Sequence, residues 1–221
     1  MPLIRPGHKK VKRIQRRGTS RGYEPSSLGG VLKQLLVSQV RVDILKLFLL
    51  RPAVSYHVRE ITRRVGTEIN AVRRELGNLV SIGMLQSSPQ KNRIYYQLRK
   101  DFPLLYEVLG LIIKEEGIGK SLVKGRGVGD VKFAFVSIPF LLGRVAGSQD
   151  IDLLVVGRAP LRKISDVVKE EEKHRGQEIN YAVLSEREFE ELKKRRDPTI
   201  INALLQPKVV LTSGSENYLT L

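Results

Sequence analysis

The chain has 221 residues, of which 41% are hydrophobic and 28% are charged, a balance typical of globular proteins. It contains no cysteine, which excludes disulfides, thiolate metal sites and a cysteine nucleophile. No apolar run approaches the roughly 18 residues of a membrane-spanning helix, and the N-terminus lacks the apolar segment of a secretory signal. We therefore expect a cytoplasmic protein with no membrane partner.

The formal net charge of +16 is unevenly distributed along the chain. Residues 1–30 carry eight lysines and arginines against one acid, residues 31–117 carry fourteen against eight, and residues 118–221 carry seventeen against fourteen. A basic surface attracts polyanions and releases counterions when it meets a phosphate backbone. The first half is therefore expected to bind nucleic acid, although basic tails also bind membranes or acidic proteins.

The first thirty residues differ in composition from the rest. They combine many charges with few large apolar side chains, and they end in a stretch rich in glycine and serine, GTSRGYEPSSLGG. Such a segment buries too little apolar surface to offset the entropy lost on ordering. The sequence predicts a mostly disordered basic arm over residues 1–30.

Apolar residues at helical spacing predict three helices between residues 38 and 83. Ser38 is a plausible N-cap for the first helix, and Pro52 lies beyond its end. Ser55 is expected to cap the second helix, and Gly66 to end it. A third helix is expected to follow Thr67 as its N-cap. Its predicted inward face comprises Ile69, Val72, Leu76, Leu79 and Val80.

A β-hairpin is predicted after the third helix. Strand-forming residues flank a turn expected at residues 87–90, and Lys91 and Arg93 give the hairpin a basic tip. Three helices followed by a hairpin, within about seventy residues, is the order of a winged helix-turn-helix domain. In helix-turn-helix folds the later helix of the pair lies in the major groove of DNA.

The residues expected to contact DNA lie on the outward face of the third helix, just before the turn and in the hairpin. Arginine can bond guanine, asparagine can bond adenine, and the flanking cations are placed for phosphates. The alternative is a solvated helix face on which arginines pair with glutamates at helical spacing. The candidate DNA-binding residues are Arg63, Arg64, Asn70, Arg73, Arg74, Asn78, Lys91 and Arg93.

The segment YHVREITRRVGTEINAVRRELGNLVSIGML, followed by IYYQL, resembles the ArsR-type winged helix of many prokaryotic transcriptional regulators. The resemblance covers about seventy residues, taken as 31–100, and implies binding of double-stranded DNA. In such regulators a helix after the wing often makes the contact of a homodimer. The apolar helix predicted over residues 101–117 could do this, or it could be a core helix that joins the two halves.

Two nucleotide-binding motifs fail in the glycine-rich stretch at residues 117–130. A P-loop ending in Gly119-Lys120-Ser121 would need a glycine where Lys114 stands. A dinucleotide fingerprint on Gly125 and Gly127 would need a third glycine at Asp130. We interpret this stretch as a flexible, basic linker between domains.

Residues 131–221 alternate between strand and helix patterns, which predicts a small α/β domain. Strands are expected at 131–138, 151–157, 178–184 and after residue 207, with a capping box that opens a helix at Ser185. Asp150 and Asp152 lie two residues apart at the start of a strand, so their carboxylates face one side. Paired carboxylates of this kind suit Mg²⁺ that also holds nucleotide phosphates.

The sequence LLGRVAGSQDIDLLVVG and the residues around it resemble the minimal nucleotidyltransferase domain of the polymerase β superfamily, in the form fused behind an ArsR-type winged helix. The resemblance implies that Asp150 and Asp152 bind metal, and that Glu178 is the third catalytic acid. Mg²⁺ and a nucleoside triphosphate are implied only for an active enzyme. A Gly-Ser pair that binds phosphate in the family falls on Ile138 and Pro139 here.

This departure predicts a loss of phosphate binding. Ile138 adds a branched side chain where the family has glycine, and Pro139 has no N–H to offer. Proline is tolerated in the first turn of a helix, so the fold can survive the change. The neighbouring Ser137 could compensate only if the backbone shifts.

The sequence therefore predicts an α+β protein with a winged helix over 31–100, a connecting helix and linker over 101–130 and a nucleotidyltransferase-like domain over 131–221. The favoured hypothesis is a DNA-binding transcriptional regulator whose second domain is inactive or repurposed, with a homodimer and a protein partner of the C-terminal domain as further expectations. The alternative is a Mg²⁺-dependent nucleotidyltransferase that modifies a protein or RNA, as related small domains in toxin–antitoxin systems do. A third hypothesis is RNA binding by the basic arm.

Overall fold

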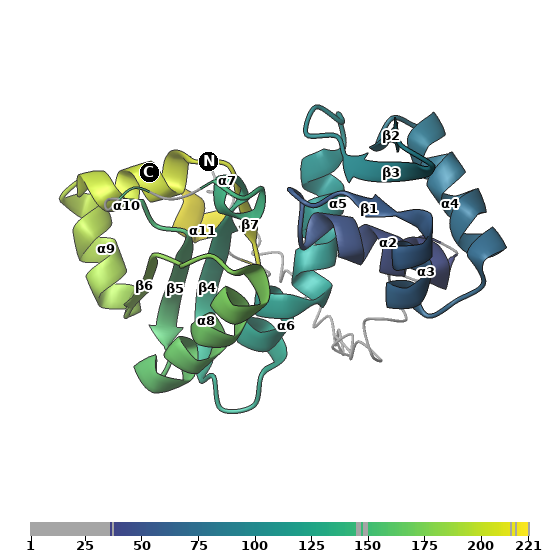
Figure 1. Cartoon of the computed structure of the whole chain (residues 1–221). Helices are drawn as coiled ribbons and strands as arrows, with labels where there is room; N and C mark the ends of the chain where they lie inside the picture. Colours follow the sequence, from purple (N-terminus) through teal and green to yellow (C-terminus); the bar gives the residue numbers. More distant parts are fainter. Residues whose placement is uncertain are drawn as a thin grey trace, which may run out of the picture.

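The computed structural model describes residue 36 and residues 38–144, 147, 150–212, 214 and 216–220. The predicted basic arm at 1–30 lies outside the described residues. The described part is a mixed α+β protein with two small sheets, one in each half of the chain (Figure 1). None of its helices is long and apolar enough to cross a membrane.

The elements follow one another along the chain as labelled in Figure 1. The first half contains α2 (Gln39–Leu49), β1 (Tyr56–His57), α3 (Val58–Val65), α4 (Ile69–Ser81), β2 (Leu85–Gln90), β3 (Arg93–Leu98) and α5 (Leu105–Glu115). The second half contains α6 (Gly117–Lys124), β4 (Asp130–Ser137), α7 (Ile138–Leu141), β5 (Leu153–Arg158), α8 (Leu161–Arg175), β6 (Tyr181–Leu184), α9 (Glu186–Lys194), α10 (Pro198–Leu205), β7 (Lys208–Val210) and α11 (Glu216–Leu219).

The ends of the first two helices test the predicted caps. The Ser38 hydroxyl accepts a hydrogen bond from the Arg41 backbone N–H at 3.2 Å, which confirms this N-cap. Gly66 ends α3 in the left-handed conformation with φ of 70°, as expected. Ser55 does not cap α3, because Tyr56 and His57 first pair with β3 as strand β1 and the helix begins only after them.

The third helix, α4, begins one residue later than predicted. Its N-cap is Glu68 and not Thr67, and no side chain caps the helix there. Val72, Leu76 and Leu79 are buried as predicted, whereas the flanking positions Ile69 and Val80 are only half-buried. The buried face therefore follows the i, i+4, i+7 spacing of one helix side.

The hairpin forms, but its turn lies later than predicted. Strand β2 continues through residues 87–90, and the turn falls at Lys91 and Asn92. The sheet order β1-β3-β2 puts β2 at an edge, where Pro89 can pair opposite Ile94 without a ladder hydrogen bond of its own. The basic tip with Lys91 and Arg93 is confirmed.

A buried ion pair fixes α4 against α2. Glu75 on α4 is 4% exposed, and its carboxylate accepts a hydrogen bond from the Arg41 Nε of α2 at 2.9 Å. Burial acts to raise the pKa of Glu75. Hydrogen bonds from Arg41, Asn78 and Ser38, together with the Arg41 charge, outweigh that effect and hold the pKa below its usual value.

The two halves share one hydrophobic core through α5 and α6. Leu105, Leu109, Ile112 and Ile113 of α5 are buried, and α5 contacts both α2 and β7. The core-helix alternative for residues 101–117 is thus confirmed, while the homodimer stays a prediction. The prediction of a flexible linker at 117–130 is wrong for its first part. Residues 117–124 form α6, which packs on α5 and α8.

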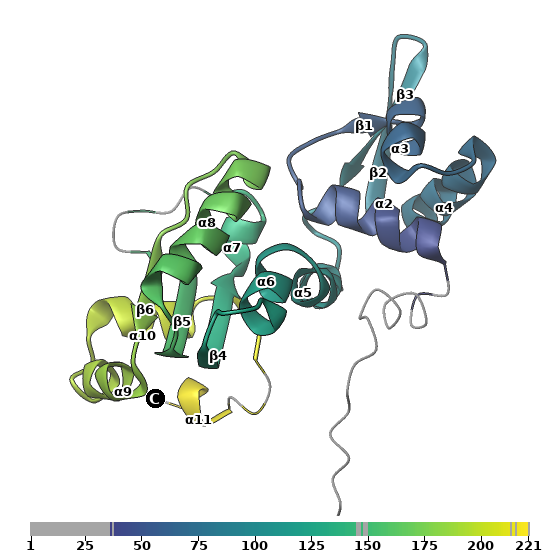
Figure 2. The same cartoon turned by 90° about the horizontal axis from the view of Figure 1, so that it is seen from below.

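The second sheet has the order β6-β5-β4-β7 and is covered on both faces. Strand β5 is antiparallel to β4 and parallel to β6. Alternate residues of β4 and β5 point to opposite faces: Ala134 and Val155 pack toward α8, and Phe133 and Leu154 pack toward α9 and α10 (Figure 2). The uninterrupted apolar run in β5 reflects burial on both faces.

Removing the Arg41 guanidinium tests the ion pair between α2 and α4. We expect Arg41→Ala to lower the free energy of unfolding at neutral pH by about 1–3 kcal/mol, because it leaves the buried Glu75 carboxylate without its main partner. The loss should shrink as the pH falls through the lowered pKa of Glu75, where the wild-type pair itself is lost. Urea denaturation at several pH values measures both effects.

The matched control is Arg187→Ala, which breaks an exposed pair with Glu191 whose side chains are 88% and 49% exposed. It should change stability by less than about 0.5 kcal/mol. An equal loss in the two variants would contradict the role given to Glu75 burial.

Candidate functional site

A basic surface covers α3, α4 and the hairpin of the first sheet. All eight residues that the sequence predicts for DNA binding are exposed in the structure. Figure 1 shows that the three elements carrying them adjoin at one end of the molecule. The structure thus brings these residues to one region of the surface.

Two of the eight side chains are hydrogen-bonded to glutamates, which reduces their availability. Arg64 donates two hydrogen bonds to Glu60, at 3.0 and 2.9 Å, and its guanidinium lies over the Tyr56 ring. Asn78 donates to Glu75 at 3.4 Å. These contacts hold both side chains against the protein, so they are the less accessible members of the set.

The remaining cations are not neutralised by any acidic side chain of the described residues. Among the described residues, Arg63, Arg74, Lys91 and Arg93 make no ion pair, and Arg73 makes only a hydrogen bond to the Asn70 side chain, at 3.3 Å. Residues 56–98 hold three acids. Two of these, Glu60 and Glu75, are paired with arginines other than Arg73 and Arg74. The alternative in which glutamates neutralise the α4 arginines does not match these contacts.

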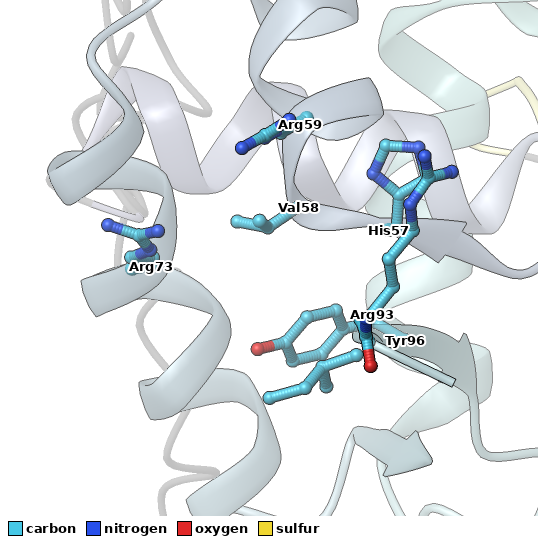
Figure 3. Close-up of a pocket in the computed structure, with 8 residues that line it drawn as sticks. His57, Val58, Arg59, Arg73, Arg93 and Tyr96 are labelled. Carbon is cyan, nitrogen blue, oxygen red and sulfur yellow. The ribbon is translucent and has the colours of Figure 1, made fainter. Parts of the chain in front are cut away.

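A hollow of about 470 Å³ opens between α3, α4 and the hairpin (Figure 3). Three arginines from three different elements line it: Arg59 of α3, Arg73 of α4 and Arg93 of β3. In Figure 3, Val58 and Tyr96 lie between Arg73 and Arg93. The full lining is His57, Val58, Arg59, Arg73, Asn92, Arg93, Ile94 and Tyr96.

Sequence reasoning missed Arg59. Arg59 precedes Arg63 by four residues, so the two lie on one side of α3. That spacing was the available signal.

The second candidate site lies at the start of β5. Asp152 is 1% exposed and accepts a hydrogen bond through Oδ2 from the Asn180 backbone N–H at 3.1 Å. Its Oδ1 has no hydrogen-bond partner among the described residues. Burial raises the pKa of Asp152, the Asn180 N–H and the Arg144 charge act against this rise, and the Asp150 charge adds to it.

Asp150 occupies a more open position with its own partners. The Arg144 guanidinium lies 3.1 Å from its Oδ2, and the same oxygen accepts a hydrogen bond from the Gly147 N–H at 2.9 Å. An arginine thus supplies a positive charge next to the carboxylate that the sequence assigns to a metal ion. The two aspartates therefore differ: Asp152 is enclosed, whereas Asp150 is half-buried and paired with Arg144.

Glu178 does not join the two aspartates. It is exposed and lies before β6, which begins only at Tyr181. The residue beside Asp152 on the neighbouring chain segment is Asn180, which offers an amide instead of a third carboxylate. Within the described part of the chain, no three acidic, histidine or cysteine side chains form a group that could hold a metal ion.

Ser137 and Ile138, next to and within the pair at which the sequence resemblance predicts a loss of phosphate binding, are held by short-range contacts. The Ser137 hydroxyl is buried and caps α7 by accepting a hydrogen bond from the Phe140 N–H at 3.3 Å. Ile138 is 5% exposed and packs into the main core. Ser137 is thus already used as a helix cap, and the compensation considered from the sequence does not occur.

A smaller cavity of about 350 Å³ lies outside Pro139 and reaches Arg144 and Asp150. Asn202 and Gln206 of the α10 region line its other side, but Asp152 does not line it. A nucleotide in this cavity would therefore meet the Arg144–Asp150 pair and not the enclosed carboxylate. A scan against protein-family models, a search of curated proteins and a search of solved structures found no match to this chain.

The enclosed carboxylate gives a prediction about stability. Because burial raises the pKa of Asp152, the ionised form costs folding free energy, and this cost grows as the pH rises through that pKa. We expect Asp152→Asn to raise the free energy of unfolding at neutral pH by about 1 kcal/mol, and the gain to fade at acid pH. Thermal unfolding at both pH values measures it.

Asp150→Asn serves as the control, because Asp150 is paired with Arg144 and not enclosed. It should produce no gain in stability. A loss of stability in Asp152→Asn at neutral pH would contradict the cost assigned to the buried charge.

Proposed function

We propose that residues 38–98 bind double-stranded DNA as a winged helix, with α4 in the major groove and the β2–β3 hairpin as the wing. The observation that supports this most is the exposed, unneutralised set of arginines on α4 and the hairpin. DNA affinity comes chiefly from cations that replace condensed counterions on phosphates. Arginines held in internal ion pairs would have lost most of that capacity.

The dimensions of α4 suit this role. Its 13 residues span about 20 Å, and an α-helix fits the major groove, which is about 12 Å wide. The buried side of the helix holds Val72, Leu76 and Leu79, so its opposite side is free to meet base edges. Asn70, Arg73 and Arg74 lie on this side, with Arg63 near the turn for a phosphate.

We assign the second half a regulatory or assembly role without nucleotidyl transfer. Magnesium requires near-octahedral oxygen coordination, commonly from one or two carboxylates with water and phosphates. Here one carboxylate is enclosed, the other is paired with Arg144, and no third acid joins them among the described residues. These residues do not fit the metal, so no catalytic step is assigned to them.

One observation favours the alternative of a Mg²⁺-dependent nucleotidyltransferase. Asp152 keeps a buried oxygen without a partner, and buried polar atoms in native proteins are nearly always satisfied. A cation could provide that partner. The transfer of a nucleotide to a protein or RNA acceptor therefore needs a direct activity assay.

The first test removes the proposed reading residues. Arg73→Ala combined with Arg74→Ala should weaken binding to duplex DNA by at least tenfold at low salt, because two cations are lost from the groove face. The slope of log affinity against log salt should fall by about 1–2. Fluorescence anisotropy with a mixed-sequence duplex measures both quantities.

The control removes the same charge from another exposed helix. Arg162 and Lys163 lie on α8 in the second half, and both are exposed. Their replacement by alanine should leave the affinity and the salt slope nearly unchanged. If both double variants weaken binding equally, net charge and not α4 determines the affinity.

The second test looks for nucleotidyl transfer. The full chain incubated with labelled nucleoside triphosphates and Mg²⁺ or Mn²⁺, alone or with cell extract as acceptor, should incorporate no label above that of Asp152→Ala. Millimolar Mg²⁺ should likewise leave the melting temperature unchanged. Incorporation that depends on Asp152 would establish the enzyme alternative.

A further inference from the structure

The hollow lined by Arg59, Arg73 and Arg93, here the three-arginine hollow, has a function of its own. We propose that it seats one backbone phosphate of the DNA together with its deoxyribose, beside the stretch of groove that α4 reads. This inference rests on the proposed DNA binding and specifies where one strand of the duplex is held. It also adds Arg59, Ile94 and Tyr96 to the interface.

The positive charge of the hollow favours the binding of an anion. Its lining contains three guanidinium groups and no acidic side chain. None of the three makes an ion pair with any described residue. Like charges gathered around one hollow repel each other. The attraction of each guanidinium to a bound phosphate would offset this repulsion. Guanidinium groups also match the geometry of phosphate oxygens by donating two parallel hydrogen bonds.

The rest of the lining suits a sugar. Val58, Ile94 and Tyr96 contribute apolar surface, and Ile94 is 52% exposed, so its side chain is open to a ligand in the hollow. A volume of about 470 Å³ exceeds what a bare phosphate needs and lies within the range of small-ligand sites. A deoxyribose phosphate would place its sugar on the apolar residues and its oxygens among the arginines.

The backbone holds two walls of the hollow at a fixed distance from each other. His57 of β1, the residue before α3, pairs with Tyr95 of β3, and their rings pack edge to face with centroids 5.7 Å apart. Arg59 follows His57 by two residues, and Arg93 precedes Tyr95 by two. The short β1–β3 ladder therefore fixes the segments that carry Arg59 and Arg93 before any ligand binds, which lowers the entropy cost of binding.

The place of the hollow favours the DNA backbone over a free anion. Arg73 belongs both to the hollow and to the outward face of α4, so a phosphate bound here is next to the groove that α4 enters. The wing tip at Lys91 and Asn92 continues the basic surface beyond Arg93. Contacts of this kind set the register of a protein on the duplex without reading its sequence.

The first experiment removes Arg59 from the full chain and measures duplex affinity over a range of salt. Arg59 supplies one of the three guanidinium groups around the phosphate, so its loss should weaken binding at low salt and lower the salt slope by up to about 0.9. The deficit of Arg59→Ala relative to wild type should then narrow by up to about 3.5-fold between about 50 and 200 mM salt. Arg162→Ala, which removes an equal charge from α8, should match wild type. Equal slopes in wild type and Arg59→Ala would overturn the proposal.

The second experiment places a carboxylate inside the hollow. Ile94→Glu should pair with the arginines, repel phosphate and weaken duplex binding at least fivefold at low salt. Ile82→Glu makes the same chemical change at a residue 59% exposed at the far end of α4 and outside the hollow. It should bind nearly as wild type does. Circular dichroism and thermal unfolding of each variant establish that it is folded.

The outcomes separate this inference from the proposed function. If wild type does not bind duplex DNA, the proposed function fails and the inference fails with it. If wild type binds and the α4 double variant does not, while Arg59→Ala and Ile94→Glu bind like their controls, only the hollow is misassigned. Inorganic phosphate and a deoxynucleoside monophosphate serve as competitors. Tight binding of either at micromolar concentration, unaffected by duplex, would identify a small-anion site and overturn the backbone assignment.

Discussion

The basic surface depends on the ion pair made by a single carboxylate, that of Glu75. Helix α4 contains one acid, Glu75, in the sequence INAVRRELGNLVS, next to Arg74. That acid faces inward and binds Arg41 of α2, so it neutralises neither Arg73 nor Arg74. The same ion pair fixes how α4 lies on α2. One interaction thus sets both the orientation of the helix and the unneutralised charge of its outer side.

The sequence predicted the first half well because its signals are local. Apolar spacing located α2, α3 and α4, and the Ser38 and Gly66 caps depend only on neighbouring residues. The wrong start of α3 came from strand pairing between distant parts of the chain. Tyr56 and His57 continue an apparent helix pattern, yet they form β1 because Tyr95 and Tyr96 of β3 are available to pair with them. The same pairing positions Arg59, which is why the hollow could not be read from the sequence.

In the second half, local patterns located strands but could not show which side chains meet. Strand spacing placed Asp150 and Asp152 at the start of a strand, whereas both precede β5, which begins at Leu153. It could not show that Asp152 is enclosed, that Arg144 pairs with Asp150, or that Asn180 stands beside Asp152, since each depends on a contact between distant segments. The loss of phosphate binding predicted at Ile138 and Pro139 stays a prediction. The structure shows that Ser137 caps α7 and that Ile138 packs in the core.

The packing of α5 makes the two halves mechanically dependent on each other. Its buried residues belong to one core cluster with Leu45 of α2 and Val209 of β7, and β7 borders β4, which leads into α7. Two polar contacts add to this link: Lys46 bonds Glu116 at 2.7 Å, and Arg51 donates to the His174 carbonyl at 3.1 Å. A shared core does not deform freely. A change in packing near Asp152 would therefore reach α2, the helix that holds α4 in place through Arg41. This gives the second half a physical route to influence the DNA binding that we propose for α4.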